Sequence, residues 1–340
     1  MQTAKPVLAL LLIGCGARQP DWSPTDDSDL PTALVGGELL GQGRTTILVQ
    51  GDRITQVGGD VPGGVLIEDI TGSCVAPAFI DSHVHLAFTP KAEEMAQGAI
   101  AGAVDLAAPV GWLGTRPSEV EVQASGPMIT AVGGYPTQTW GADGYGEQVS
   151  GAAQASAATV ALIAAGADLI KVALTGEPTL TDEELAAVVT AAHDANKKVA
   201  AHALSEEAAA RAAAAGVDVL AHTPTEALSD ATVNAWAEGA VISTLRAFGG
   251  SATTVDNLRR LDQAGATILY GTDFGNTQTA GIDEAELQLM REAGLSQTRL
   301  RLSATEAPAD FWGFDRLGRV AVDKSDRLWI GPCDCLWCDR

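Results

Sequence analysis

An apolar run leads directly into two histidines in the stretch Val75-Ala76-Pro77-Ala78-Phe79-Ile80-Asp81-Ser82-His83-Val84-His85. Further apolar, strand-like runs each carry or end in a residue suited to a metal site. They are residues 169–174 around Lys171, 199–201 before His202, 217–221 before His222, and 266–270 before Gly271-Thr272-Asp273. Strands that deliver polar side chains at their carboxyl ends, separated by helical stretches, are typical of a (β/α)8 barrel. The sequence therefore predicts an α/β fold, a TIM barrel with its site at that end.

Short strand-like runs flank the predicted barrel on both sides. They are residues 33–40, 46–50, 53–58, 65–70, 318–322 and 327–330. Because turn residues separate these runs, they favour a small all-β unit built from both ends of the chain. We expect a β-sandwich formed by residues 33–74 plus 306–335, beside a metallohydrolase barrel formed by residues 75–305.

The stretches between the barrel strands carry helix start and stop residues. Thr181 stands three residues before Glu184, which is the spacing of a capping box. Ser205 opens a second alanine-rich helix that ends before Gly216. The helices predicted in this region are residues 91–101, 154–165, 182–195, 205–215, 231–238, 254–263 and 283–293.

The first fifteen residues have the pattern of a secretory signal. Lys5 precedes a short apolar run at residues 7–13, too short to span a bilayer but long enough for a signal peptide. Leu12-Ile13-Gly14-Cys15 resembles a bacterial lipobox, in which Cys15 is lipidated; an ordinary signal peptide with a chance cysteine is the alternative. Residues 16–32 are predicted to be a flexible tether. We expect a lipid-anchored protein of the bacterial cell envelope, at the outer membrane or the periplasmic face. Gly16 after the cysteine suggests sorting to the outer membrane, by resemblance to Gram-negative lipoproteins.

The charge balance excludes some classes of partner. The chain has 43 Asp and Glu against 21 Lys and Arg, a net charge of −22. Nucleic acids and anionic bilayer surfaces are bound by basic patches, so neither is expected as a partner. A small-molecule substrate fits better, with membrane attachment only through the lipid anchor, and the sequence leaves open whether the chain forms a homo-oligomer.

The cysteines after the signal segment fall in two places. Cys74 precedes the first barrel strand and is expected to be a small buried residue. Cys333, Cys335 and Cys338 crowd the last eight residues. They can hold a metal or form one disulfide with one cysteine left over, and an untidy, partly oxidised tail is the favoured interpretation.

The ligand-bearing strand ends have the chemistry of a metal site. Two residues at i and i+2 on a strand point the same way, so His83 and His85 can bind one ion. His202 and His222 can bind a second, and Asp273 can bind the first ion and accept a proton. Lys171 can become a metal ligand when burial lowers the pKa of its amine. The neutral amine can take up CO2 to form a carbamate, whose two oxygens are enough to bridge two ions. Its alternative is a lysine paired with a buried carboxylate.

Together these motifs resemble the amidohydrolase superfamily of metal-dependent hydrolases, of the binuclear type near the imidazolonepropionase-like and prolidase-like branch. The resemblance covers about residues 33–330. It implies that one ion, held by His83, His85 and Asp273, is the more buried. It also implies that His202 and His222 hold the other ion and that carboxylated Lys171 bridges the two, most often Zn²⁺. The chain departs from the family after Val322, where it has Asp323-Lys324-Ser325-Asp326-Arg327-Leu328.

The site so assembled predicts hydrolysis of a C–N bond in an amide, cyclic amide or dipeptide, without restriction to peptides. A hydroxide held between two divalent ions is nucleophilic near neutral pH, and Asp273 would pass its proton to the leaving amine. A mononuclear deaminase-like enzyme, a lactone or phosphoester hydrolase, and an inactive lipid-anchored binding protein are the alternatives.

Three further residues are candidates for substrate contact. Tyr135 and Trp140 follow the third barrel strand, where barrel enzymes place binding loops, although aromatic residues there can also pack the loop. Arg246 follows the seventh strand and can hold a substrate carboxylate with its guanidinium. The alternative for Arg246 is a salt bridge to a neighbouring acid.

Overall fold

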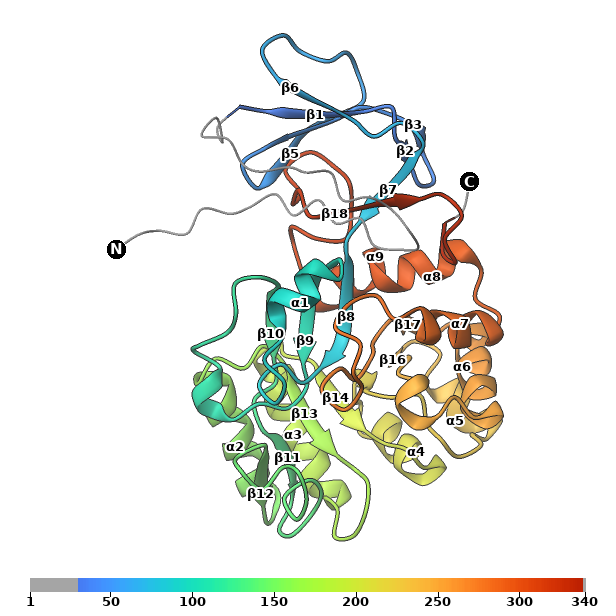
Figure 1. Ribbon diagram of the computed structural model, residues 1–340. Helices are drawn as coiled ribbons and strands as arrows, with labels where there is room; N and C mark the ends of the chain where they lie inside the picture. The colour runs from blue at the N-terminus through green and yellow to red at the C-terminus, as the bar shows by residue number, and fades with distance from the viewer. Residues whose placement is uncertain (1–29, 339–340) are drawn as a thin grey trace.

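The computed structural model describes residues 30–338, in which an α/β region lies below two small sheets (Figure 1). Cys15, the signal segment 1–15 and most of the tether 16–32 lie outside the described residues. Within residues 30–338 no helix is long and apolar enough to cross a membrane.

Strands from both ends of the described chain form the two small sheets. They are β1 (Thr32–Val35), β2 (Glu38–Leu39), β3 (Gly43–Arg44), β4 (Ile47–Gln50), β5 (Arg53–Val57), β6 (Leu66–Asp69), β7 (Ser73–Pro77) and β18 (Leu328–Pro332). One sheet has the order β5-β4-β1-β6 and the other β18-β7-β2-β3. Leu34, Ile54 and Ile330 belong to one buried apolar cluster, so the early and late segments pack against each other.

Two of the predicted strands in this part differ from the structure. The run at residues 33–40 is two strands, because the chain turns at Gly36, where φ is +82°. A Cβ at Gly36 would lie 2.1 Å from Thr71 Oγ1, so glycine is required there. Residues 318–322 form bends and the start of a turn instead of a strand, and Asp323 donates its backbone N–H to the carbonyl oxygen of Ile54.

Cys74 is buried, as expected, but the expectation for the late cysteines was wrong. Cys74 is bonded to Cys333, and Cys335 to Cys338, so all three late cysteines are paired. The tail is also packed. Trp337 is buried, and its ring lies 4.8 Å from that of Phe79.

Parallel strands make up the centre of the α/β region. They are β8 (Phe79–Val84), β9 (Ile100–Asp105), β10 (Glu121–Ala124), β11 (Met128–Ala131), β12 (Gly146–Val149), β13 (Ile170–Ala173), β14 (Val199–His202), β15 (Val219–Leu220), β16 (Ala240–Ile242) and β17 (Thr267–Leu269). One sheet has the order β12-β11-β13-β14-β15-β16-β17 and a second has the order β10-β9-β8. The backbone N–H of Ser82 donates to Tyr270 at 2.9 Å, and that of His85 to Phe274 at 2.7 Å. These bonds join β8 to the chain after β17, an arrangement compatible with a TIM-barrel-like fold.

Helices connect most of these strands. They are α1 (Ala92–Gln97), η1 (Val110–Trp112), α2 (Ala152–Ala164), α3 (Asp182–Asp194), α4 (Glu206–Ala214), α5 (Asp230–Ala235), η2 (Arg246–Phe248), α6 (Ala252–Ala264), α7 (Glu284–Glu292), α8 (Gln297–Ala304) and α9 (Glu306–Trp312). The capping box of Thr181 and Glu184 is present, and Ser205 caps α4. Helix α1 is shorter than predicted. It ends at Gly98, where a Cβ would lie 2.4 Å from Gly281 Cα.

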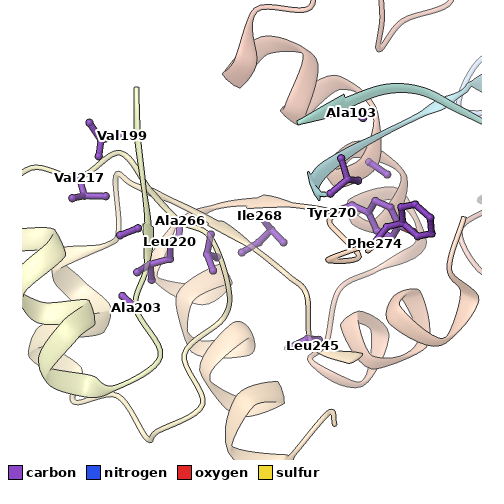
Figure 2. Packing of buried hydrophobic residues seen from close by; sticks show 14 of the residues in the cluster. Ala103, Val199, Ala203, Val217, Leu220, Leu245, Ala266, Ile268, Tyr270 and Phe274 are labelled. Carbon is purple, nitrogen blue, oxygen red and sulfur yellow. The ribbon is translucent and has the colours of Figure 1, made fainter. Parts of the chain in front are cut away.

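Both faces of the parallel strands are buried, in two separate apolar clusters. Val199 and Ala201 pack in the larger cluster, whereas Ala200 between them belongs to the second. Leu220 and Ile268 lie in the larger cluster as well, close to the helices in Figure 2. Burial on both faces is normal for parallel strands. It leaves the carboxyl ends of the strands as the place where polar side chains meet a cavity.

Candidate metal centre and active site

His83, His85 and Asp273 converge at one point. The Nε2 atoms of the two histidines are 3.3 Å apart. Asp273 Oδ1 lies 3.5 Å from Nε2 of His83 and 3.1 Å from Nε2 of His85. All three side chains are buried. Their candidate ligand atoms lie within 4.8 Å of one another, which is close enough for one ion to contact them all.

The hydrogen bonds of His83 fix which ring nitrogen faces the cavity. Its Nδ1 lies 2.8 Å from the carbonyl oxygen of Ala221, which only accepts, so Nδ1 carries the proton. Burial lowers the pKa of His83 well below its ordinary value, and the charge of Lys171 adds to the effect. The ring is therefore neutral, and Nε2 presents a lone pair toward His85 and Asp273.

His202 and His222 form a second pair. Nε2 of His222 lies 3.0 Å from Nδ1 of His202, and Nδ1 of His222 lies 3.0 Å from Thr244 Oγ1. Burial lowers the pKa of His202 to about 3 and that of His222 well below its ordinary value. The two histidine pairs are adjacent, because the rings of His83 and His222 are 4.4 Å apart.

Lys171 lies among these imidazoles and is almost fully buried. Its Nζ has no hydrogen-bond partner within residues 30–338. Burial lowers the pKa of this amine to about 7, and Asp273 works in the opposite direction. The expected alternative, a lysine hydrogen-bonded to a buried carboxylate, is thus not what the described residues form.

A network behind the ligands holds the end of β8 and the loop after β17 together. Asp81 accepts hydrogen bonds from the backbone of His83 at 3.1 Å and from the backbone of Thr272 at 3.0 Å. The backbone of Asp273 donates to His83, and Asp273 has a left-handed φ of 56°. Gly271 permits this approach, because a Cβ there would lie 3.2 Å from the His83 Cβ.

The donor set fits divalent metal ions. Unprotonated imidazoles and a carboxylate are the ligands that zinc prefers. A buried amine without a partner is costly unless it is converted or compensated. His85 Nδ1 is likewise buried without a partner among the described residues. The four imidazoles and Asp273 therefore present lone pairs toward one cavity that a cation can occupy, with the Lys171 amine beside them.

The ligands open into a cavity of about 490 Å³ whose lining includes Tyr135, Trp140 and Phe248. Each of these rings packs against an imidazole. The distances between ring centroids are 5.3 Å for Trp140 and His85, 4.9 Å for Tyr135 and His202, and 4.8 Å for Phe248 and His222. Tyr135 and Trp140 thus lie where the sequence placed them. Phe248 was missed, because a lone phenylalanine after a strand carries no distinguishing pattern.

Arg246 does not line this cavity. Its Nη1 donates to Asp283 and, at 2.9 Å, to Thr279. Its backbone N–H donates to Glu286 at 2.7 Å. The geometry therefore corrects the expected substrate clamp to its alternative, a salt bridge to a neighbouring acid. Asn276 takes a place at the cavity instead, and donates to Asp273 Oδ1 at 3.0 Å.

A larger cavity of about 800 Å³ lies elsewhere, beside the amino ends of β8 and β9. Its arginines are engaged, since Arg116 pairs with Asp168 at 2.6 Å and Arg316 with Asp52 at 2.9 Å. The metal-site residues are not among its lining. We therefore place the chemistry in the smaller cavity.

A family model described as "Amidohydrolase family" matches residues 118–325. The chain belongs to this family. The matched segment holds Lys171, His202, His222 and Asp273, whereas His83 and His85 precede it. As an amidohydrolase the protein is a hydrolase of amide-type C–N bonds, which confirms the enzyme class expected from the sequence.

Solved structures similar to this amidohydrolase agree on the fold. A Xaa-Pro dipeptidase with bound methionine has a TM-score of 0.75 at 23% identity, covering 87% of this chain and 92% of that one. A putative prolidase from Bifidobacterium longum has a TM-score of 0.75 at 23% identity, covering 89% and 88%. Phenylurea hydrolase B has a TM-score of 0.69 at 19% identity, covering 87% and 90%. No curated protein matches this chain.

Proposed function

We propose that the protein is a binuclear, metal-dependent amidohydrolase that cleaves the C–N bond of a small-molecule amide. The observation that carries the proposal is the position of Lys171. Its buried, unpartnered amine lines the same cavity as both histidine pairs. A lysine in this position is close to both groups of candidate ligands, His83 with His85 and His202 with His222.

The residues divide into two ligand groups with one link. His83, His85 and Asp273 would hold one divalent ion, and His202 with His222 would hold the other. Lys171, carboxylated by CO2, would be a ligand shared by both ions. When bound, such ions, which we expect to be Zn²⁺, lower the pKa of water to about 7 and polarise a carbonyl oxygen.

Asp273 is the residue placed to move the proton. Its Oδ1 faces the two Nε2 atoms of His83 and His85, and Asn276 donates to the same oxygen. Asp273 would accept the proton of the attacking water and deliver it to the leaving nitrogen. The carbonyl carbon gains the oxygen, and the C–N bond breaks.

Metal content tests the proposal directly. Elemental analysis of active, purified protein should find two divalent ions per chain, and Lys171→Ala should lose one ion together with turnover. Lys91→Ala, at an exposed lysine paired with Glu94, is the matched control. One tightly held ion in active protein, with turnover retained in Lys171→Ala, would favour the mononuclear deaminase-like alternative.

We propose that the eight parallel strands β8, β9, β11, β13, β14, β15, β16 and β17 close into a (β/α)8 barrel over residues 75–305. The bonds from Ser82 to Tyr270 and from His85 to Phe274 support closure between β8 and β17. A β-sandwich domain that joins residues 33–74 to the late segment around β18 is supported by the shared apolar cluster of the two four-stranded sheets. The expected bounds 306–335 are too wide, because residues 306–312 form helix α9 and pack with the barrel strands. Limited proteolysis should leave residues 75–305 as one resistant fragment.

We also propose that the protein is an envelope lipoprotein anchored through Cys15. The pairing of Cys74 with Cys333 supports an oxidising compartment, because structural disulfides persist there and are rare in the cytosol. Metabolic labelling with palmitate should mark the wild-type protein and fail in Cys15→Ser. Labelling that persists without Cys15 would remove the anchor from the proposal.

A further inference from the structure

We infer that the substrate of this amidohydrolase is an uncharged amide with a flat aromatic or apolar group beside the scissile bond, and without a free carboxylate. The inference rests on the proposed function and deepens it by naming the substrate class. It is carried by the walls of the 490 Å³ cavity and by the position of Arg246.

The walls next to the metal ligands are aromatic. Trp140, Tyr135 and Phe248 each contact a different ligand histidine, with ring centroids 4.8 to 5.3 Å apart. Met128 and Leu204 add aliphatic surface to the lining. Any substrate whose carbonyl reaches the ligands must therefore place its neighbouring groups between these rings. Flat apolar groups gain most there, since ring pairs at 4.5–7 Å stabilise beyond the area they bury.

Trp140 and Tyr135 are held in place as a unit. Trp140 Nε1 donates to the Tyr135 hydroxyl at 2.9 Å. Phe88, at 46% exposure, packs edge-on against Trp140 with the ring centroids 5.9 Å apart, and so extends the aromatic wall toward solvent. The indole N–H of Trp140 is already hydrogen-bonded to Tyr135. The wall therefore presents mainly the faces of its aromatic rings to a substrate, and few hydrogen-bond donors.

The described lining lacks a cation that could read a carboxylate. Apart from the six ligand side chains, its polar residues are Tyr135, Thr139, Thr175 and Asn276 with the Trp140 indole, all of them uncharged at neutral pH. Arg246, the arginine nearest in sequence to this lining, is turned to Asp283 and Thr279. A carboxylate entering here would lose water without a guanidinium to replace it.

The charge of the whole molecule acts in the same direction. The net charge of −22 lowers the local concentration of anions around the cavity and slows their association. A cation would be drawn to the surface but would meet the positive charge of the bound metal ions inside. An uncharged amide has neither penalty. Its hydrolysis consumes one water, forms a C–O bond, breaks the C–N bond and releases a carboxylic acid and an amine.

The test compares probes that differ only in charge. N-benzoyl-L-prolinamide and N-benzoyl-L-proline are the hydrolysable pair, and their benzenesulfonyl analogues, which resist hydrolysis, are the binding pair. Turnover is measured on the zinc-loaded protein, and binding by titration calorimetry. We expect the amide to exceed the acid at least about tenfold in kcat/KM and in affinity, which corresponds to about 1.4 kcal/mol.

Variants test whether the aromatic wall binds the flat group of the substrate. Trp140→Ala should weaken binding of the aromatic sulfonamide about fivefold to tenfold, with metal content unchanged. Trp112→Ala is the matched control, because Trp112 is also half-buried but does not line the cavity. Equal losses in both variants would overturn the role of the wall.

The readouts separate this inference from the proposed function. Preference for N-benzoyl-L-proline, or failure of both sulfonamides to bind, overturns the inference even if amides are hydrolysed. Preferential binding of the neutral sulfonamide without turnover of either benzoyl compound supports the inference and overturns amide hydrolysis. Preference for a cationic analogue carrying an amine in place of the carboxamide would also overturn it.

Discussion

The metal centre and the paired four-stranded sheets treat buried groups in opposite ways. In the sheets, Leu34 and Ile330 pack in an apolar cluster, and a disulfide joins Cys74 in β7 to Cys333, the residue after β18. At the metal centre, Lys171 Nζ and His85 Nδ1 are buried with no partner within residues 30–338. Unpartnered buried polar groups lower stability. The difference teaches that the sheets stabilise the chain while the metal centre keeps its polar groups available for ligands.

The largest effect should come from removing side chains of the metal centre. Lys171→Met and Asp273→Asn should each lower kcat/KM by at least about 10²–10⁴-fold, the range for losing a general acid or base, with lost ligation adding to it. Metal-free Lys171→Met should be as stable as wild type or more so, because it no longer buries an amine without a partner. Steady-state kinetics and thermal unfolding measure the two changes.

The control for this comparison is a lysine outside the site. Lys91→Met removes an exposed amine that pairs with Glu94 at 2.9 Å, and both activity and stability should change little. Wild-type turnover in fully metallated Asp273→Asn would show that another group moves the proton. A large loss of stability in metal-free Lys171→Met would show that the amine has a stabilising role.

The next effect belongs to the sheets. Replacing Cys74 and Cys333 by serine should lower the free energy of unfolding by roughly 2–5 kcal/mol, because their bond closes a loop with a sequence separation of 259 residues. The folded fraction should keep its kcat/KM, since the bond lies away from the cavity. Urea denaturation with and without a reductant measures the change.

The second disulfide provides the matched control. Cys335 and Cys338 are only 3 residues apart, so opening their loop releases much less chain entropy. The double serine variant at these positions should therefore lose less stability than the variant at Cys74 and Cys333. If both pairs cost the same, packing of Trp337 against Phe79 would account for the tail better than loop closure does.

A smaller effect concerns Asp326, just before β18. It is 9% exposed, and burial raises the pKa of its carboxyl from 3.8 to about 6. The folded state therefore binds this proton more tightly than the unfolded state does. Its contribution to stability is fully present below about pH 4 and is lost as the pH rises through about 6. Asp326→Asn should add on the order of 1–3 kcal/mol at pH 8.

The same variant should gain little at pH 4, where the carboxyl of folded Asp326 is protonated and is therefore as uncharged as the amide of Asn. Thermal unfolding at a series of pH values measures this. A gain that is equal at pH 4 and pH 8 would mean that shape, and not ionisation, explains the effect of Asn. A loss at pH 8 would mean that the ionised carboxylate is stabilised by Arg327 or Arg316, whose charges lower its pKa.

The parts of the site that could be predicted from sequence are those tied to strand ends. His83, His85, Lys171, His202, His222 and Asp273 each follow or interrupt an apolar run, so their spacing along the chain gave their position in the fold. The capping box at Thr181 was predictable for the same reason, because the interaction is local.

What could not be predicted depends on contacts distant in sequence. The predicted strand is interrupted at Gly36, where Thr71 packs against the backbone. Cys74 is bonded to Cys333, which lies 259 residues later in the sequence. Phe248 reaches His222 through the turn of η2. A local sequence pattern does not predict contacts between residues that are distant in sequence. The direction of a side chain after a strand depends on the residues of the neighbouring loop that it contacts. Roles for Tyr135 and Trp140 in substrate binding remain predictions.

The smallest effect is expected at Arg246, whose side chain the sequence alone could not direct. Its guanidinium is bound to the buried carboxylate of Asp283, and the same carboxylate accepts from Ala285 and Glu286 at the start of α7. Arg246→Gln should therefore cost ~1 kcal/mol of stability, as for a partly exposed ion pair. It should leave the ratio of kcat/KM between N-benzoyl-L-prolinamide and N-benzoyl-L-proline unchanged. Trp140→Ala, by contrast, should weaken both substrates through the shared benzoyl ring. If Arg246→Gln selectively raised KM for the free acid, the arginine would read a carboxylate after all, and the distinction between a ligand-binding wall and a structural salt bridge would fail at this loop.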